Sequence, residues 1–314
     1  MMECRSLSLA GVTVCVSSPD LARFFDACGG FGCFCTSDAT PHWEVRYGQP
    51  VAPWNDATLL SEFHFLENQS RCCFLRSGDS YQFAMYSDVG NRLLVCLQYR
   101  RGASVVDISS CDDVPAWRFS LWFACSLLGL QADATFVHSS AVVWQGQAVL
   151  FLGESGTGKS THARLWLQTI EGCQLLNDDS PFLRLVDGVP IVYGSPWSGK
   201  SPVFSPRHFP LKAVVRLSQA SHNAIRRLSV VESFGALQPS LPPALMQDDG
   251  IRTADSGSGM NAADLLIEMI SQTLTAVPVY HLQCLPDDDA AHLCFATLFG
   301  TSQTTMHSAR KEMF

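Results

Sequence analysis

Apolar and polar positions alternate in short runs through the first third of the chain, a pattern typical of β-strands. Leu7–Val16 alternates in part, and the other strand-like runs are 71–75, 81–86 and 92–99. The segments between them, Ser-Gly-Asp and Asp-Val-Gly-Asn, are turn sequences. Residues 1–112 are therefore predicted to form a β-rich N-terminal region.

The pattern becomes helical from Asp113 to Leu130, with Pro115 in the first turn and Asp112 or Asp113 as the cap. The most apolar part of this segment, 119–130, is about 12 residues long, whereas a membrane-spanning helix needs about 20. The segment is therefore predicted to be a buried helix, and the sequence predicts no membrane partner.

Strands and helices alternate through the rest of the chain, which predicts an α/β domain over residues 113–314. The expected strands cover 135–144, 147–152, 174–176, 182–185, 190–193 and 211–217. The expected helices cover 160–169, 262–276 (capped by Asn261) and 288–299 (capped near Asp287). The stretch 247–260 is polar and rich in Gly and Ser, and we expect it to be a mobile loop.

A glycine-rich segment follows the apolar strand Ala148–Leu152, namely Gly153-Glu154-Ser155-Gly156-Thr157-Gly158-Lys159-Ser160. It matches the phosphate-binding loop G-x-x-x-x-G-K-[ST] at every fixed position. Its glycines let backbone N–H groups curl around an anion, and the following helix adds its N-terminal dipole. Lys159 is expected to reach the β- and γ-phosphates, and the Ser160 hydroxyl to ligate Mg²⁺.

Two carboxylates end the apolar run Leu175-Leu176-Asn177-Asp178-Asp179, about twenty residues after the loop. The spacing suits a strand–helix–strand crossover, which would bring the carboxylates to the sheet edge that holds the loop. Asp-Asp-Ser-Pro is also a good solvated turn. Our hypothesis is that Asp178 is a general base and Asp179 a metal partner, and the sequence leaves open which of the two is the base.

Three segments together resemble the catalytic domain of HPr serine kinase/phosphorylase. They are Phe136-Val137-His138-Ser139-Ser140, Gly153–Thr161 (GESGTGKST) and Asn177-Asp178-Asp179, in that order and spacing. The resemblance spans residues 135–300. The segments 193–200 and 278–282 look typical of the HPr-kinase-related proteins, a divergent group that includes lasso-peptide precursor kinases.

The resemblance implies a P-loop fold shared with ATP-dependent phosphoenolpyruvate carboxykinase. It also implies catalytic roles for His138, Lys159 and Asp178, nucleotide binding by 153–161, and Mg²⁺ binding by Ser160 and Asp179. Lys200 and, more weakly, Arg164 are further candidates for contacting phosphate. The glycine-rich acidic signature of the bifunctional enzymes is replaced here by 195–200, so the resemblance gives no basis for phosphorylase activity or for recognition of HPr.

Composition narrows the choice of partners. The 314 residues are 47% hydrophobic and carry a net charge of −8, which is typical of a folded protein and argues against nucleic acid as the main partner. The 13 cysteines form no CxxC pair, so we interpret them as small buried side chains in a reducing cytoplasm, with a metal or redox role as the alternative. Family resemblance suggests a homo-oligomer, although no sequence feature predicts one.

The sequence thus predicts an ATP-dependent kinase that uses Mg²⁺ and phosphorylates a hydroxyl, with serine of a protein or peptide as the first candidate and a small molecule as another. Two alternatives remain. One is an ATP-binding regulatory module without turnover. The other is a carboxykinase-like lyase, which would need a cluster of arginines that the sequence does not show.

Overall fold

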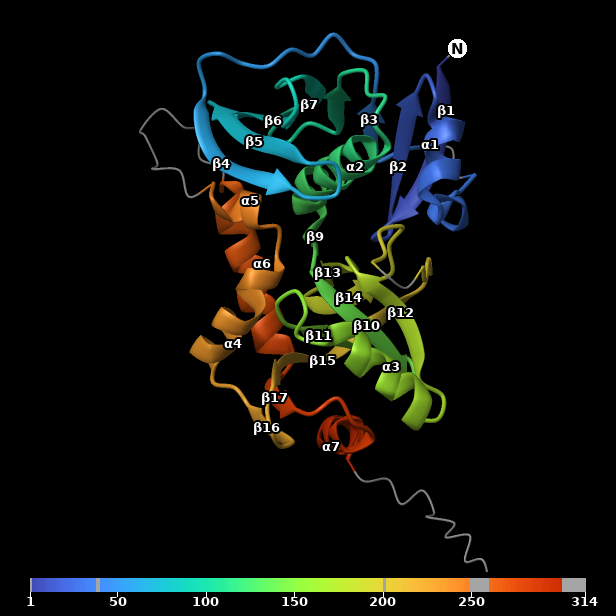
Figure 1. The fold of residues 1–314 in the computed structure, drawn as a ribbon, viewed down its shortest axis with the longest axis vertical. Helices are drawn as coiled ribbons and strands as arrows, with labels where there is room; N and C mark the ends of the chain where they lie inside the picture. Colours follow the sequence, from blue (N-terminus) through green and yellow to red (C-terminus); the bar gives the residue numbers. More distant parts are fainter. Residues whose placement is uncertain (1, 38–39, 200–201, 249–259, 301–314) are drawn as a thin grey trace, which may run out of the picture.

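A computed structural model describes residues 2–37, 40–199, 202–248 and 260–300. These residues form a mixed α/β structure with an eight-stranded and a nine-stranded sheet. In Figure 1 the N-terminal sheet occupies the upper half of the molecule, and the second sheet, with the glycine-rich loop, lies below it. None of the helices in these residues is both long and apolar enough to cross a membrane.

The N-terminal sheet has the strand order β1-β2-β3-β8-β7-β6-β5-β4. Helix α2 (Val114–Gly129) packs on it through Trp117, Leu121 and Phe123, and Asp113 caps the helix as the sequence predicts. A short helix α1 (Leu21–Cys28) and a 3-10 turn (Phe31–Phe34) follow β2. The strands are β1 (Glu3–Leu9), β2 (Val12–Ser18), β3 (Trp43–Arg46), β4 (Thr58–Phe65), β5 (Ser70–Ser77), β6 (Ser80–Ser87), β7 (Leu93–Arg100) and β8 (Val105–Ile108).

The strand-like run predicted over 7–16 is divided between β1 and β2. Ala10 and Gly11 both have a left-handed backbone, with φ of 49° and 75°. Two such residues in succession make a tight hairpin turn, and the segment therefore folds into the antiparallel pair β1 and β2.

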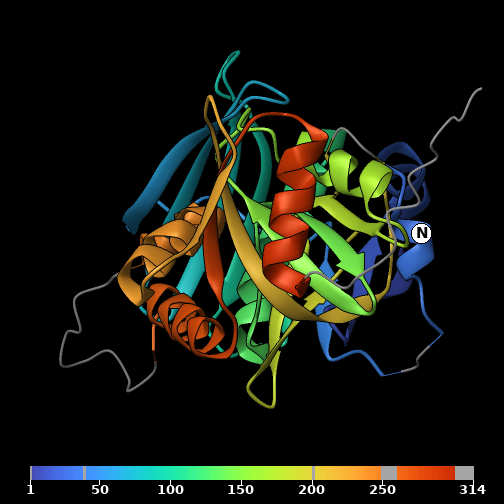
Figure 2. The ribbon, with the colours of Figure 1, turned by 90° about the horizontal axis from the view of Figure 1, so that it is seen from below.

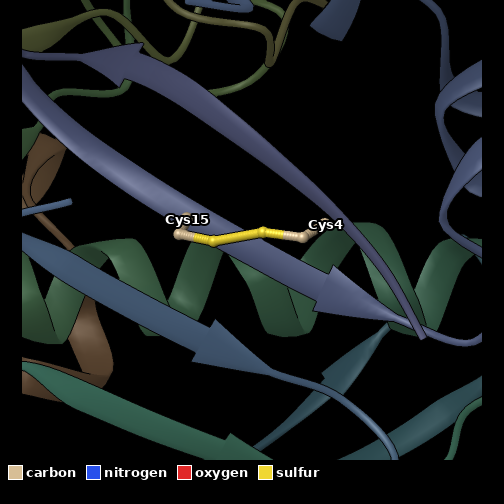
Figure 3. Close-up of a disulfide and its surroundings, with 2 residues drawn as sticks. All are labelled: Cys4 and Cys15. Carbon is tan, nitrogen blue, oxygen red and sulfur yellow. A yellow bond between two sulfur atoms is a disulfide. The ribbon is translucent and has the colours of Figure 1, made fainter. Parts of the chain in front are cut away.

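The same hairpin corrects the interpretation of the cysteines. Cys4 on β1 and Cys15 on β2 form a cross-strand disulfide with their Cα atoms 6.7 Å apart (Figure 3). Six of the other cysteines are buried, as expected of small apolar side chains, whereas Cys33 and Cys35 are exposed. The expectation that all thirteen are reduced is therefore wrong for this pair.

The second sheet has the order β12-β10-β11-β15-β14-β13-β9, with β17 on β15 and β16 on β17. Its strands are β9 (Ala134–Phe136), β10 (Ser139–Trp144), β11 (Gln147–Leu152), β12 (Gln174–Asp179), β13 (Phe182–Val186), β14 (Val189–Tyr193), β15 (His208–Gln219), β16 (Ala224–Arg227) and β17 (Val279–Cys284). The helices of this part are α3 (Lys159–Thr169), α4 (Val230–Leu237), α5 (Pro243–Met246), α6 (Ala262–Ala276) and α7 (Asp288–Phe299).

Helices α3 and α7 cover one face of this sheet (Figure 2). A compact apolar cluster joins Trp166 of α3 and Leu298 of α7 to Val149 and Phe151 of β11. The opposite face joins a larger core that includes α4, α5, α6 and the N-terminal sheet. Burial on both faces explains why β11 is an uninterrupted apolar run.

The predicted strand 135–144 is broken in two. Val137 donates its backbone N–H to the Pro181 carbonyl, and His138 donates its own to the Ser240 carbonyl at 2.7 Å. Because these two residues bond outside the ladder, β9 pairs with β13 while β10 pairs with β11 and β12. The break leaves His138 at the start of β10.

Strands β11, β15 and β17 are parallel neighbours. Strand β12 also runs parallel to β11, but β10 lies between them and is antiparallel to both. The end of β11, the end of β12 and the start of β10 therefore meet at one sheet edge. The crossover predicted from the sequence holds, with one strand inserted in it.

Candidate functional site

The glycine-rich loop joins β11 to α3 at this edge. Gly153, Gly156 and Gly158 have φ of 154°, 82° and 106°, a range that side-chain-bearing residues rarely adopt. The Thr157 hydroxyl and N–H both bond to the Glu154 carbonyl, which closes the loop on itself. Helix α3 begins at Lys159, directly after the loop, so the N–H groups of its first turn, which lack partners within the helix, lie next to the loop.

Lys159 is held in place by three acceptors. Its Nζ lies 2.7 Å from the Gly153 carbonyl, 3.3 Å from the Glu154 carbonyl and 3.0 Å from Nε2 of His138. Burial lowers the pKa of the lysine, and Asp179 and Asp178 oppose that shift. An ammonium has three protons, and the protein engages all of them.

His138 connects the loop to the acidic strand. Burial, followed by the charge of Lys159, lowers the pKa of the imidazole, against the opposing influence of Asp179. The neutral ring accepts from Lys159 at Nε2, which leaves the proton on Nδ1, 3.5 Å from Oδ1 of Asp179. The structure therefore brings the His, the Lys and one Asp expected from the sequence into a continuous chain.

The two carboxylates have different surroundings. Asp178 is only 4% exposed; its Oδ1 accepts from the Ser140 hydroxyl at 2.5 Å, and its Oδ2 is buried without a hydrogen-bond partner among the described residues. The Asp179 side chain is 37% exposed and accepts from the Ser180 hydroxyl at 3.0 Å. Carboxylates that differ so much in solvation suit different tasks.

Asn177 fixes the direction of both carboxylates, a role that the sequence did not reveal. Its Oδ1 accepts from the N–H groups of Asp179 and Ser180, and its Nδ2 donates to the carbonyls of Ser195 and Trp197. The only signal in the sequence was its place in an Asn-Asp-Asp-Ser turn.

Arg216 is a second residue that the sequence did not suggest. It lies opposite Leu152 near the end of β15, and its Nη2 approaches Glu154 Oε1 at 3.4 Å. Gln219 of the same strand donates to the Gly156 carbonyl at 3.2 Å. Their position near the end of a strand parallel to β11 was the missed signal.

Arg164, one of the two weaker candidates, does not join the site. Arg164 is exposed, and it bonds back to the Ser160 carbonyl and the Thr161 hydroxyl of its own helix. Lys200 lies outside the described residues, as does 249–259, most of the stretch expected to be a mobile loop. No group of three or more His, Cys, Asp or Glu side chains gathers as a metal site in the part of the chain that is described.

Cavities lie near both ends of the contact chain from Lys159 to Asp179. One of about 360 Å³ lies beside the loop and the first turns of α3. The other, of about 190 Å³, lies beyond Asp179 and reaches to α2 and β4. The first is lined by Gly156, Thr157, Gly158, Thr161, His162, Leu165, Leu217, Gln219, Ala220, Cys284, Leu285 and Pro286.

No family model and no curated protein matches the chain. Among solved structures, the HPr(Ser) kinase/phosphatase from Coxiella burnetii is similar at 13% sequence identity and a TM-score of 0.28. The similarity covers 52% of this chain and 92% of that one. Similarity at this level is distant, and it establishes neither the fold nor the activity of this chain.

Proposed function

We propose that this chain is an ATP-dependent kinase that transfers the γ-phosphate of Mg²⁺-ATP to a hydroxyl, with serine of a peptide or protein as the acceptor. The observation that carries the proposal is the contact chain Lys159–His138–Asp179. Lys159 is suited to bind a phosphate, and Asp179 is suited to accept a hydroxyl proton. The imidazole of His138 contacts both side chains.

The donor end is the loop. Free N–H groups at the start of α3 and the ammonium of Lys159 supply positive potential for a triphosphate. The 360 Å³ cavity beside the loop falls within the size range of small-ligand sites, and its apolar walls Leu165, Leu217 and Pro286 suit a purine base. These features support a nucleotide over a simple phosphate.

The residues also suit Mg²⁺, which in such sites takes one or two protein oxygens together with waters and substrate phosphates. Ser160 offers a hydroxyl at the start of α3, and Asp178 has an unpartnered carboxylate oxygen. A bound Mg²⁺ would neutralise charge on the β- and γ-phosphates.

The environments of the two carboxylates favour the reverse of the roles hypothesised from the sequence. Asp179 is the more exposed, contacts His138, and borders the cavity beyond the acidic pair. We assign proton acceptance from the acceptor hydroxyl to Asp179. Asp178, buried and tied to Ser140, is assigned to the metal side.

The test is phosphoryl transfer from γ-labelled ATP to a panel of serine peptides by the wild type and two variants. Asp179→Asn should lower transfer about 100-fold or more while Mg²⁺-ATP affinity changes little. Asp178→Asn should weaken Mg²⁺-dependent nucleotide binding as well. Asp187→Asn, on an exposed turn whose φ of 50° suits asparagine, is the control that removes a carboxylate remote from the site.

The outcomes separate the alternatives. Nucleotide binding without transfer to any acceptor would replace the kinase with a regulatory ATP-binding module. Full transfer by Asp179→Asn, with loss in Asp178→Asn, would restore the sequence-based assignment of roles. A protein that takes up no Mg²⁺-ATP in calorimetry would refute the proposal.

A further inference from the structure

The cavity beyond Asp179 is built from three distant segments. Phe65 is the last residue of β4 and Glu67 lies in the turn after it, and Pro115, Arg118, Phe119 and Trp122 come from α2. Asp179, Ser180 and Trp197 close it from the side of the second sheet. At about 190 Å³ it is smaller than the cavities that hold drug-sized ligands and has room for about one side chain.

Four of its nine lining residues are aromatic. Phe65 and Phe119 lie with ring centroids 4.6 Å apart, and Phe119 stacks on Trp122 at 5.5 Å. Trp197 is buried, and its indole N–H donates to the Arg118 carbonyl at 3.2 Å, which holds the ring against α2. A half-buried aromatic wall of this kind favours a large apolar group over water.

Arg118 is a polar residue in the lining of the same cavity. Arg118 donates from Nη2 to the Ser198 carbonyl at 3.2 Å, while its Nε is buried with no partner in the described structure. A buried donor without a partner is costly. A peptide carbonyl in the cavity could reach this nitrogen only after a shift of the Arg118 side chain, because the atom has almost no exposed surface.

The reacting side of the cavity is Asp179. Its Oδ1 faces His138, which in turn contacts Lys159. The cavity therefore lies at the Asp179 end of the contact chain, and the phosphate loop lies at the Lys159 end. A serine side chain is too short to cover the aromatic wall while its hydroxyl lies at Asp179. The wall therefore suits the residue next to that serine.

We propose that this cavity is the acceptor subsite and that it takes a peptide with a phenylalanine-sized apolar side chain next to the phosphorylated serine. This inference rests on the proposed kinase function. The side chain occupies the space between Phe65, Phe119 and Trp197, and the serine hydroxyl lies at Asp179.

The test uses two capped peptides, one with phenylalanine beside its serine and one with alanine there. Binding is measured by calorimetry on the full chain, and kcat/KM is measured with Mg²⁺-ATP. Burial of one phenylalanine side chain predicts that the wild type binds its peptide about tenfold or more tightly than the alanine peptide. The preference in kcat/KM should be similar.

Phe65→Ala should reduce this preference to about threefold or less, because it removes one face of the wall. Phe63→Ala is the matched control. Phe63 lies on the same strand and also packs on Phe119, at 6.1 Å between centroids, but it does not line the cavity. It should keep the wild-type preference, and Mg²⁺-ATP affinity should stay unchanged in both variants.

Binding and transfer distinguish the two proposals. A binding preference that Phe65→Ala removes, without transfer to either peptide, supports the subsite and counts against the kinase. Transfer with no preference between the peptides overturns the subsite and leaves the kinase standing. Equal loss of preference in both variants, or transfer only to a tyrosine peptide, also overturns it.

Discussion

All three protons of the Lys159 ammonium have acceptors within the protein. The acceptors are two loop carbonyls and the imidazole of His138. A triphosphate bound as proposed would have to replace at least one of these partners. The imidazole is the most readily released, because the carbonyls belong to the loop itself and stay beside the lysine.

Lys159→Ala should therefore weaken Mg²⁺-ATP binding about 10- to 100-fold, the amount expected for one or two hydrogen bonds to a charged group. Stability should change little, because burial already disfavours this ammonium. Isothermal calorimetry gives the affinity, and urea unfolding gives the stability. Unchanged affinity would show that the loop does not hold the phosphates.

His162 is a buried histidine that makes stability depend on pH. It is 3% exposed, its Nε2 accepts from the Trp166 indole at 3.2 Å, and burial lowers its pKa from 6.5 to about 4. The unfolded chain therefore binds the proton more tightly, and the stabilisation present above pH 6.5 is lost as the pH falls toward 4.

Between pH 7.5 and 5 this histidine should cost about 2 kcal/mol of the free energy of unfolding. Urea titrations at both pH values measure the loss. The His162→Gln variant should lack that share of the pH dependence. An equal loss in the variant would assign the effect to other groups.

At the scale of elements, the segment after β14 braces the acidic strand. Gly199 donates its N–H to the Asp178 carbonyl at 3.0 Å, and a Cβ at Gly194 would lie 1.9 Å from the Ser205 carbonyl oxygen. Neither backbone contact leaves room for a methyl group.

Gly194→Ala should destabilise the protein by about 3 kcal/mol, because the backbone of Ser205 must shift. Gly235, inside α4, has open space around it. Gly235→Ala should instead stabilise the protein by about 0.5 to 1 kcal/mol. Thermal unfolding of the two variants tests the pair, and similar melting temperatures would contradict it.

Elements with local signals were predictable. The loop, α2 with its Asp113 cap, and the two C-terminal helices follow from motifs, capping residues and periodicity. The break between β9 and β10 at Val137–His138 was not predictable, because it depends on hydrogen bonds to Pro181 and Ser240, which are distant in the sequence. Helix α4, despite its capping box at Ser229, was also missed.

The same division holds for the candidate site. Residue types and spacing suggested Lys159, the acidic pair and, through resemblance, His138. Sequence could not give the unequal solvation of Asp178 and Asp179, because Ser140 on the neighbouring strand determines it. Nor could it associate Phe65 with Asp179, which are far apart in the chain and border one cavity.

At the scale of the whole molecule, Asp248 joins the N-terminal sheet to the helices beside the second sheet. This fully buried carboxylate accepts from Arg76 and Tyr81, both at 2.6 Å, and from the N–H of Ala262 at 2.9 Å. Burial raises the pKa of Tyr81, and the hydrogen bond to Asp248 raises it further. One side chain thus connects β5, β6 and α6.

Asp248→Ala should destabilise the protein by about 3 kcal/mol, because it leaves a largely buried guanidinium unpaired. Asp79→Asn is the control: the Asp79–Arg101 pair spans 3.7 Å with Asp79 52% exposed, and its loss should cost less than about 1 kcal/mol. Chemical denaturation measures both. Equal losses of stability in the two variants would show that the buried Asp248 contacts contribute no more to stability than the exposed Asp79–Arg101 pair.

The cavity next to Asp179 is lined in part by residues of β4 and α2, whereas the cavity beside the glycine-rich loop is lined by no residue of either element. Under the proposed function, substitutions in β4 and α2 should therefore change which hydroxyl is recognised and leave triphosphate binding unchanged. Relatives with diverged β4 and α2 would serve different acceptors with one shared phosphate chemistry.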